Sequence, residues 1–190
     1  METAESVRQE AVHTKSGVAL AVPFLMVAAV VFAADQATKY AVATMVDRGD
    51  AVTVTSFFRI THVTNTGSAF GMLQGQSNFL ILASIIGVLA VVFYYRANGR
   101  ESFVLRFALG MVMGGALGNM ADRVLRGAVV DFIDVQIWSG FHWPSFNIAD
   151  SSLLIGLVSL AFYVIRQRDP LRGSMAQPVP PATDGVDPER

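Results

Sequence analysis

The chain has 190 residues, of which 53% are hydrophobic and 15% charged, whereas soluble domains carry about 25% charged residues. This composition indicates a membrane protein. The 14 Lys and Arg balance 15 Asp and Glu without a basic stripe, which excludes a nucleic-acid-binding protein. The absence of cysteine excludes disulfides, thiolate metal sites and a cysteine nucleophile.

Four apolar stretches approach the roughly 20 residues that a helix needs to cross a bilayer. They cover about residues 18–34, 78–95, 103–120 and 148–165. The first stretch can continue to residue 46, and it has no signal-peptide cleavage site before Asp35, so we expect it to be retained. The pattern predicts an all-α membrane protein, a bundle of four transmembrane helices.

Basic residues orient these helices, because an excess of Lys and Arg marks cytoplasmic loops. They gather in the N-terminal flank, in the connection between the second and third helices, and in the C-terminal flank: Arg8, Lys15, Arg96, Arg100, Arg106, Arg166, Arg168 and Arg172. Both termini are therefore predicted to be cytoplasmic, and the loops at about 47–77 and 123–147 to face outward. Four arginines lie in or beside those outward loops. They reduce the excess of basic residues on the predicted cytoplasmic side without reversing it.

The polar ends of the chain divide it into three parts. Residues 1–16 and 168–190 are predicted to be disordered cytoplasmic tails around a membrane domain at 17–167. Within that domain, the sequence at residues 51–63 tends to alternate between apolar and polar side chains and is rich in β-branched ones. This pattern predicts a small extracytoplasmic β-sheet, or cradle, at about 47–77 between helices 1 and 2. The second outer loop, with Trp138 and Trp143, suggests an aromatic turn at the interface.

Five polar clusters stand out from the apolar background, and the topology puts all of them on the outward side. They are Asp35 to Lys39, Asn65 to Phe70, Gly114 to Arg123, Val129 to Ile133, and Phe146 to Asp150. Carboxylates at bilayer depth are costly and usually functional. The convergence at one depth predicts a single site.

Structural roles are open for several of these residues. Asp35 and Lys39 have the i,i+4 spacing of a helix pair. Asn65 to Gly67 can be a simple turn. Gly114, Gly115 and Gly118 have the spacing of close helix packing, which is their favoured role.

The remaining candidates differ in how well a structural role accounts for them. Asp122 and Arg126 have pair spacing, and Arg123 can reach lipid headgroups. Asp150 can be a helix N-cap. Asp131 lies among apolar neighbours, so a structural role explains it least. Asp134 is expected to point to water.

Two carboxylates that share one proton can hydrolyse a peptide bond, because one activates water while the other protonates the leaving amine. This chemistry needs no metal or thiol. The three histidines show no metal-ligand spacing, and the sequence has no serine-hydrolase, zinc-protease or P-loop motif, so neither metal nor cofactor is expected.

The five clusters together resemble one family, the bacterial lipoprotein signal peptidases, or signal peptidase II. The matching stretches are Asp35-Gln36-Ala37-Thr38-Lys39, Asn65-Thr66-Gly67-Ser68-Ala69-Phe70, Gly114-Gly115-Ala116-Leu117-Gly118-Asn119-Met120-Ala121-Asp122-Arg123, Val129-Val130-Asp131-Phe132-Ile133 and Phe146-Asn147-Ile148-Ala149-Asp150-Ser151. The resemblance covers roughly residues 20–167 and has no departure at the motif positions.

This resemblance implies an aspartic endopeptidase of the bacterial inner membrane, with its site near the outer leaflet. Its implied substrates are diacylglyceryl-modified prolipoproteins, cut before the lipidated lipobox cysteine, and its implied partners are membrane lipids; a monomer is expected. The catalytic pair maps onto Asp131 and Asp150. Asn119, Asp122, Arg123 and Asn147 map onto residues around the pair that hold the substrate backbone. Asp35, Lys39, Asn65 and Gly67 map onto supporting motif positions.

Two other functions use the same residues. A small proton-coupled transporter would also need intramembrane carboxylates, but its polar residues would follow a path through both leaflets. A structural membrane protein would use its aspartates only to pair with Arg123 or Lys39. The crowding of polar residues on one side favours the peptidase.

Overall fold

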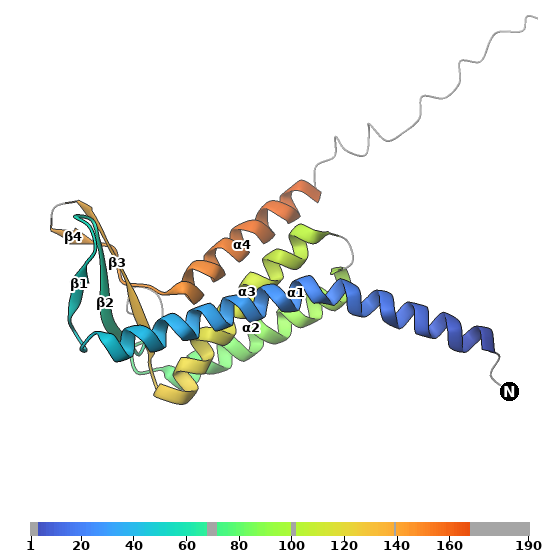
Figure 1. Ribbon diagram of the computed structural model, residues 1–190, viewed down its shortest axis with the longest axis horizontal. Coiled ribbons are helices and arrows are strands. Elements are labelled where there is room, and N and C mark those ends of the chain that lie inside the picture. Colours follow the sequence, from blue (N-terminus) through green and yellow to red (C-terminus); the bar gives the residue numbers. More distant parts are fainter. Residues whose placement is uncertain (1–3, 68–71, 100–101, 139, 168–190) are drawn as a thin grey trace, which may run out of the picture.

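The computed structural model describes residues 4–67, 72–99, 102–138 and 140–167, with side chains from Ala21 onward. Four helices alternate with short strands (Figure 1). In chain order the elements are α1 (Ala4–Met45), β1 (Ala51–Thr53), β2 (Phe58–Asn65), α2 (Ser77–Asn98), α3 (Phe103–Arg126), β3 (Val129–Trp138), β4 (Phe141–His142) and α4 (Ile148–Gln167).

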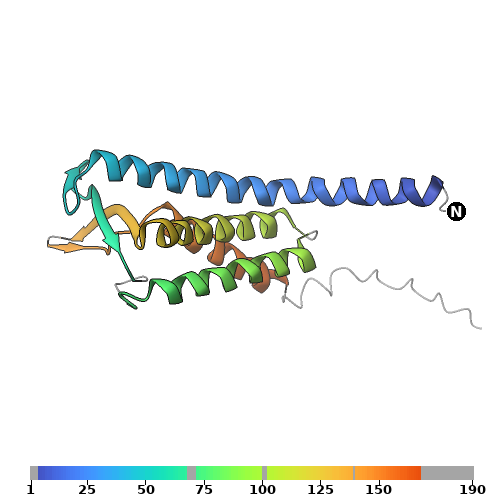
Figure 2. The same ribbon diagram turned by 90° about the horizontal axis from the view of Figure 1, so that it is seen from below.

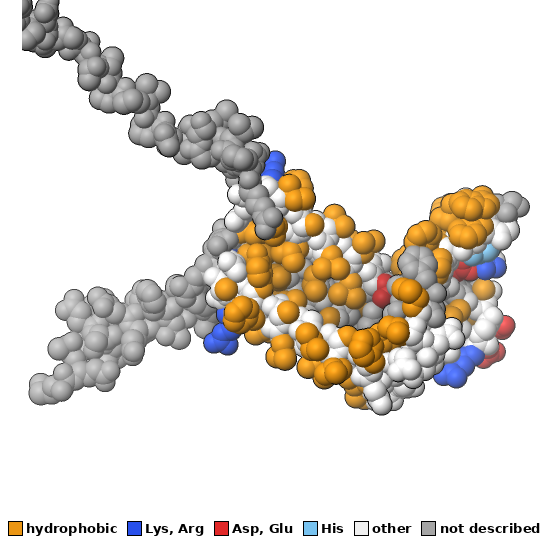
Figure 3. Space-filling model, turned by 180° about the vertical axis from the view of Figure 1, so that it is seen from behind, with side chains coloured by type: hydrophobic (Ala, Val, Ile, Leu, Met, Phe, Trp, Pro, Cys, Tyr) orange, Lys and Arg blue, Asp and Glu red, His pale blue; other side chains and the backbone are white. Residues whose placement is uncertain are grey.

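All four helices are long and apolar enough to cross a membrane. Most large apolar side chains of α1, α2 and α4 face outward, for example Phe93 and Ile165, which are 77% and 70% exposed. Figure 3 shows these side chains as a broad apolar surface over the helices, with charged side chains at the two ends. Such a surface suits a lipid environment and confirms the predicted four-helix membrane bundle.

Helix α3 lies at the centre of the bundle, and its glycines allow the close packing predicted from their spacing. A Cβ atom at Gly114 would lie 2.7 Å from the Ala28 carbonyl oxygen of α1, and one at Gly115 would lie 2.5 Å from the Ala149 carbonyl oxygen of α4. In lipid, where apolar burial drives association weakly, small residues let helix backbones approach. The core around Leu105 and Leu109 joins α3 to α1 and α2.

A four-stranded antiparallel sheet covers one end of the bundle, in the order β1-β2-β3-β4 (Figures 1 and 2). The strands predicted in the first outer loop are confirmed as β1 and β2. The second outer loop was expected to form only an aromatic turn, but it supplies the long strand β3. The run from Val129 to Val135 is mostly β-branched or aromatic, and it pairs with β2 through Val63↔Asp131 and Asn65↔Val129.

The N-terminal tail differs from the prediction. Residues 1–16 were expected to be disordered, whereas α1 begins at Ala4 and projects beyond the other helices (Figure 2). The stretch before Gly17 is polar but has no proline, and its Ala, Glu, Gln and Arg residues favour a helix. Its polarity therefore excludes a buried helix but not an exposed one. The predicted C-terminal tail at 168–190 lies outside the described residues.

Candidate active site

Asp131 lies near the start of β3, and its carboxylate is buried between amide donors from two other elements. Its Oδ2 accepts a hydrogen bond of 3.0 Å from the Asn65 side chain, and its Oδ1 accepts one of 2.7 Å from the Asn147 side chain. Because Asp131 pairs with Val63, Asn65 is its diagonal neighbour on the same face of the sheet. The strand register therefore brings Asn65 to this carboxylate.

Asp150 lies in the first turn of α4 and takes part in a reciprocal capping arrangement. The Asp150 backbone N–H donates to Asn147 Oδ1 at 2.9 Å, and the Asn147 backbone N–H donates to Asp150 Oδ2 at 3.2 Å. This is the geometry of a capping box with Asn147 as the N-cap. The other oxygen, Oδ1, accepts a 2.7 Å hydrogen bond from the Asn119 side chain. The capping role is thus shared between Asn147 and Asp150.

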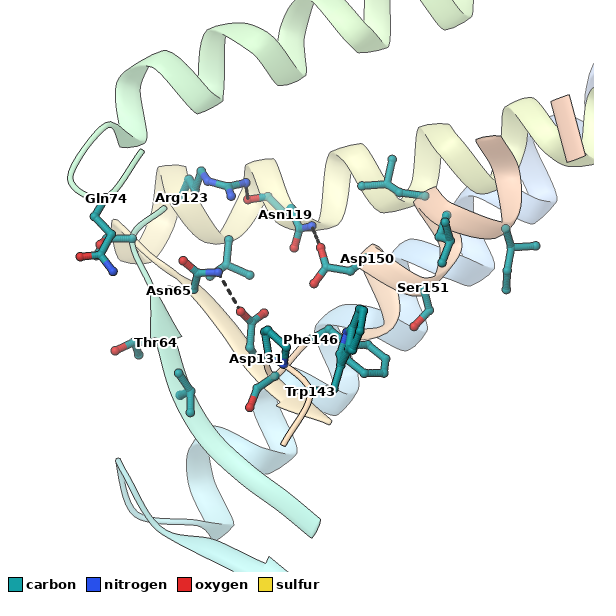
Figure 4. A pocket seen from close by; sticks show the side chains of 18 of the residues that line it. Thr64, Asn65, Gln74, Asn119, Arg123, Asp131, Trp143, Phe146, Asp150 and Ser151 are labelled. Carbon is teal, nitrogen blue, oxygen red and sulfur yellow. Dashed lines mark hydrogen bonds between the residues drawn. The ribbon is translucent and has the colours of Figure 1, made fainter. Parts of the chain in front are cut away.

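A short antiparallel bridge brings the two aspartates together. The Phe146 carbonyl oxygen accepts the backbone N–H of Ile133 at 2.8 Å, and the Phe146 N–H donates back to the Ile133 carbonyl at 3.1 Å. This bridge docks the segment before α4 onto β3. In Figure 4 the side chains of Asp131 and Asp150 point toward the same space, one from the strand and one from the helix.

The environment of Asp131 favours a proton on the pair. Burial and the negative charge of Asp150 raise the pKa of Asp131 to about 6, although hydrogen bonds from Asn65 and Asn147 and the charge of Lys39 act in the opposite direction. Two interacting carboxylates titrate together, so this pKa belongs to the pair. Near neutral pH such a pair can hold a single shared proton.

Lys39 lies beneath the aspartates in a fully buried ion cluster. Its ammonium group contacts Asp35 at 2.8 Å and Asp122 at 2.9 Å, and it donates to Asn119 Oδ1 at 3.0 Å. Asp122 also pairs with Arg126 one helical turn later. The predicted pairs Asp35–Lys39 and Asp122–Arg126 are both present, but they form one network with zero exposure at Asp35, Lys39 and Asp122.

Arg123 and Gly67 join α3 to the turn after β2. The Gly67 N–H donates to Asn65 Oδ1 at 2.9 Å, which closes a side-chain turn, and Arg123 Nη2 donates to the Gly67 carbonyl at 3.0 Å. A Cβ atom at Gly67 would lie 2.3 Å from the Met72 carbonyl oxygen, so only glycine fits. Residues 68–70 of the same motif lie outside the described residues.

The aspartates open onto a cavity of about 1030 Å³. Its polar end contains Asn65, Asn119, Arg123, Asp131 and Asp150 (Figure 4). Its apolar walls come from the segment before α4 and from the outward face of α4: Trp143, Pro144, Phe146, Leu153, Leu154, Ile155 and Leu157. A second cavity, of about 390 Å³ between α2, α3 and α4, reaches Asn119, Arg123 and Asp150 from the other side.

The structure brings all ten predicted site residues into one connected group, but only some of them line the cavity. Asp35, Lys39, Asp122 and Asn147 are fully buried and lie behind the cavity rather than on its wall. The role expected for Asp122 and Asn147, to hold a substrate backbone, stays a prediction. Asp134 was expected to point to water, but it is buried and pairs with Arg59 at 2.5 Å.

Sequence reasoning missed the apolar part of the site. Trp143 and Phe146 line the cavity next to Asp131, and Ser151 lines it next to Asp150. Phe146 is the first residue of the Phe146 to Asp150 cluster, and this place in the motif was the available signal. Apolar wall residues carry no pattern that separates them from residues facing lipid. Among the described residues, no three His, Asp or Glu side chains form a group that could hold a metal ion.

A four-helix membrane bundle with two neighbouring carboxylates under a small sheet defines a multi-pass membrane protein with an acid–base site. Comparisons with known proteins identify its family. The family model described as Signal peptidase (SPase) II matches residues 27–166. The chain belongs to this family of lipoprotein signal peptidases, which are aspartic-type proteases.

Relatives and solved structures agree with this assignment. The lipoprotein signal peptidase of Staphylococcus aureus strain MRSA252 is 39% identical over 143 residues, which cover 75% of this chain and 87% of the relative. The protein of the same name from strain JH9 is 38% identical over the same length. These matches confirm the family resemblance and leave the transporter alternative without support.

Two solved bacterial membrane enzymes share the fold. One, determined by the in meso method at 2.3 Å resolution, is 36% identical with a TM-score of 0.74 and covers 82% of this chain and 93% of its own. The other, at 1.9 Å resolution, is 39% identical with a TM-score of 0.68 and covers 74% and 91%. The fold class predicted from the sequence is therefore confirmed.

Proposed function

We propose that this chain removes signal peptides from diacylglyceryl-modified prolipoproteins, cutting before the lipidated lipobox cysteine with Asp131 and Asp150 as its catalytic pair. One observation carries the assignment of the pair. Both carboxylates face the same cavity, and each accepts a hydrogen bond from a side-chain amide that fixes the orientation of the carboxylate. The names of the relatives supply the substrate class.

The reaction follows from one shared proton. The ionised carboxylate takes a proton from a water molecule, which attacks the scissile carbonyl carbon, while the protonated carboxyl group donates to the carbonyl oxygen. Collapse of the tetrahedral intermediate returns the carbonyl, breaks the carbon–nitrogen bond and passes a proton to the leaving amine. Asn119 and Arg123 line the cavity beside the pair and are placed to bind the peptide backbone.

The cavity suits a substrate that is part peptide and part lipid. Its polar end holds the aspartates, and its apolar wall continues along α4 through the exposed side chains of Leu154 and Leu157. Arg123 lines this cavity, and its Nε atom is buried without a hydrogen-bond partner among the described residues, so the guanidinium group keeps an unused donor at the site. An acylated cysteine would bring its own apolar chains to this wall.

The same proposal includes a location. The active site lies at the sheet end of the bundle, near the outer leaflet of the bacterial inner membrane, and both termini are cytoplasmic. Support comes from Arg96, Arg106 and Arg166, which lie at or near the helix ends opposite the sheet. We propose that the chain acts as a monomer with membrane lipid around it and without metal or cofactor.

The test is cleavage of a diacylglyceryl-modified prolipoprotein by Asp131→Asn and Asp150→Asn variants in detergent or bilayers. Each substitution removes one proton-transfer partner, so kcat should fall roughly 10²- to 10⁴-fold. Asp134→Asn is the matched control on the same strand and should keep most activity. Thermal unfolding of each variant shows whether loss of turnover reflects loss of fold. Full activity in either dyad variant would contradict the assignment.

A further inference from the structure

Each candidate catalytic aspartate is preceded by a residue whose backbone N–H is held by a buried carboxylate. The Val130 N–H, just before Asp131, donates to Asp122 Oδ2 at 3.3 Å. The Ala149 N–H, just before Asp150, donates to Asp35 Oδ1 at 2.9 Å. The strand and the helix that carry the pair are thus each tied to one of two buried carboxylates.

Lys39 connects those two carboxylates. Its ammonium nitrogen lies 2.8 Å from Asp35 Oδ2 and 2.9 Å from Asp122 Oδ2, and all three side chains have zero exposure. Since one nitrogen contacts both carboxylates, the two contacting oxygens cannot move far apart without lengthening a contact. The ammonium group therefore limits how far the start of β3 can lie from the start of α4.

A third contact of Lys39 orients the amide that holds Asp150. An ammonium group has three donors and no acceptor, so it selects the oxygen of the Asn119 side chain, at 3.0 Å. The amide nitrogen of Asn119 must then face the other way, where it donates to Asp150 Oδ1 at 2.7 Å. Asn119 Oδ1 also accepts from Asn147, whose amide nitrogen holds Asp131.

We propose that Lys39 is a positioning residue that sets the spacing and orientation of Asp131 and Asp150 without touching the substrate. This inference rests on the proposed function of the two aspartates. Lys39 lines neither cavity, so it acts through its contacts with Asp35, Asp122 and Asn119 and through the effect of its charge on Asp131. Buried ion pairs are often no more stabilising than apolar replacements, so stability alone does not account for a buried cluster of this size.

The charges of the cluster determine which substitution tests this role. Lys39 and Arg126 balance Asp35 and Asp122. Lys39→Met alone would leave two buried carboxylates with one cation and could fail to fold. The double variant Asp35→Asn/Lys39→Met keeps the Asp122–Arg126 pair, and the new amide oxygen can still accept from Ala149. It removes the bridge and leaves the cluster neutral.

We expect the double variant to bind substrate with KM within about threefold of the wild type and to lose about 10²-fold in kcat, because small misplacements of catalytic groups have effects of this size. Loss of the positive charge should also raise the pKa of Asp131, so the alkaline limb of the profile of kcat/KM against pH should move to higher pH. A merely structural role would leave unchanged both this limb and the kcat measured per folded enzyme molecule.

The control is Arg59→Gln/Asp134→Asn, which removes an ion pair on the sheet without changing the net charge and should leave kcat and the limb unchanged. A folded Asp35→Asn/Lys39→Met enzyme with wild-type kcat and an unmoved limb would overturn the inference. If Asp131→Asn is inactive at the same time, the proposed function stands and only the role of Lys39 fails.

A second variant decides the question if the double variant does not fold. Lys39→Arg keeps the charge but replaces a compact donor by a planar fork, which cannot reproduce three contacts from one nitrogen. Positioning predicts a lower kcat with an unmoved alkaline limb for this variant. Wild-type kcat in folded Lys39→Arg would overturn the inference.

Discussion

At the scale of single residues, Asp131 and Asp134 show how neighbours on one strand can differ. Both are buried on β3. Burial acts to raise the pKa of Asp134, but hydrogen bonds from Arg59 and His142 outweigh it and hold that pKa below its ordinary value. Asp131 receives only neutral amide donors, and burial together with Asp150 raises its pKa. Asp134 therefore stays ionised in an ion pair, whereas Asp131 can exchange a proton near neutral pH.

The raised pKa of Asp131 predicts the pH dependence of cleavage. Burial and the negative charge of Asp150 raise this pKa to about 6, and because the two carboxylates titrate together, the value describes loss of the shared proton. The profile of kcat/KM reports the free enzyme and should fall as pH rises above about 6, because the doubly ionised pair has no proton to donate.

The alkaline fall of kcat should lie at higher pH than the alkaline fall of kcat/KM. An acylated substrate displaces water from the cavity and so favours the neutral carboxyl group in the enzyme–substrate complex. Initial rates of prolipoprotein cleavage between pH 5 and 9, analysed at low and at saturating substrate, provide both profiles. Coincident limbs would contradict the predicted effect of substrate on the pKa, and a kcat/KM that stays constant through pH 9 would count against a shared proton.

At the scale of elements, the start of α4 combines a helix cap with one of the two proposed catalytic residues. Asp150 occupies the N3 position of α4, the last residue of a capping box, where a carboxylate also interacts favourably with the helix dipole. The sequence placed Asp150 at a helix start. It could not show that Asn147 is the partner residue that both caps α4 and holds Asp131, because that contact depends on docking of Phe146 onto β3.

Helix packing provides a prediction with an internal control. Gly114→Ala would place a Cβ atom 2.7 Å from the Ala28 carbonyl oxygen, which forces α1 and α3 apart and should reduce stability by about 1–3 kcal/mol. At Gly87 in α2, a Cβ atom would meet no atom of the described residues within 4 Å. Gly87→Ala should therefore be neutral or stabilising by up to about 1 kcal/mol.

Thermal unfolding of the two variants in the same detergent gives the comparison. A lower Tm for Gly114→Ala together with an unchanged or higher Tm for Gly87→Ala is expected. Equal Tm values would mean that α1 and α3 do not pack through this glycine in the membrane.

At the scale of the whole molecule, the apolar surface and the charged ends predict a membrane orientation. The sheet and the cavity should lie on the extracytoplasmic side, and both termini in the cytoplasm. Reporter fusions to the two termini, and single cysteines introduced into the naturally cysteine-free chain at Asp47 and Gly140, test this with an impermeant thiol reagent. Labelling of the two loop positions in intact cells, with cytoplasmic reporters at both ends, is expected. Labelled termini and protected loops would reverse the orientation.

The sequence by itself determined the spans, the five polar clusters and the family, because apolar length and motif residues are local features of the chain. It also separated Asp131 from the rest, since no local partner accounts for that carboxylate. Only the tertiary structure decided which residues meet. The register of β2 on β3 brings Asn65 to Asp131, and the Phe146 bridge brings Asn147 to the same carboxylate. The burial of Lys39 between Asp35 and Asp122 joins α1 to α3, and such long-range contacts have no signature in local composition.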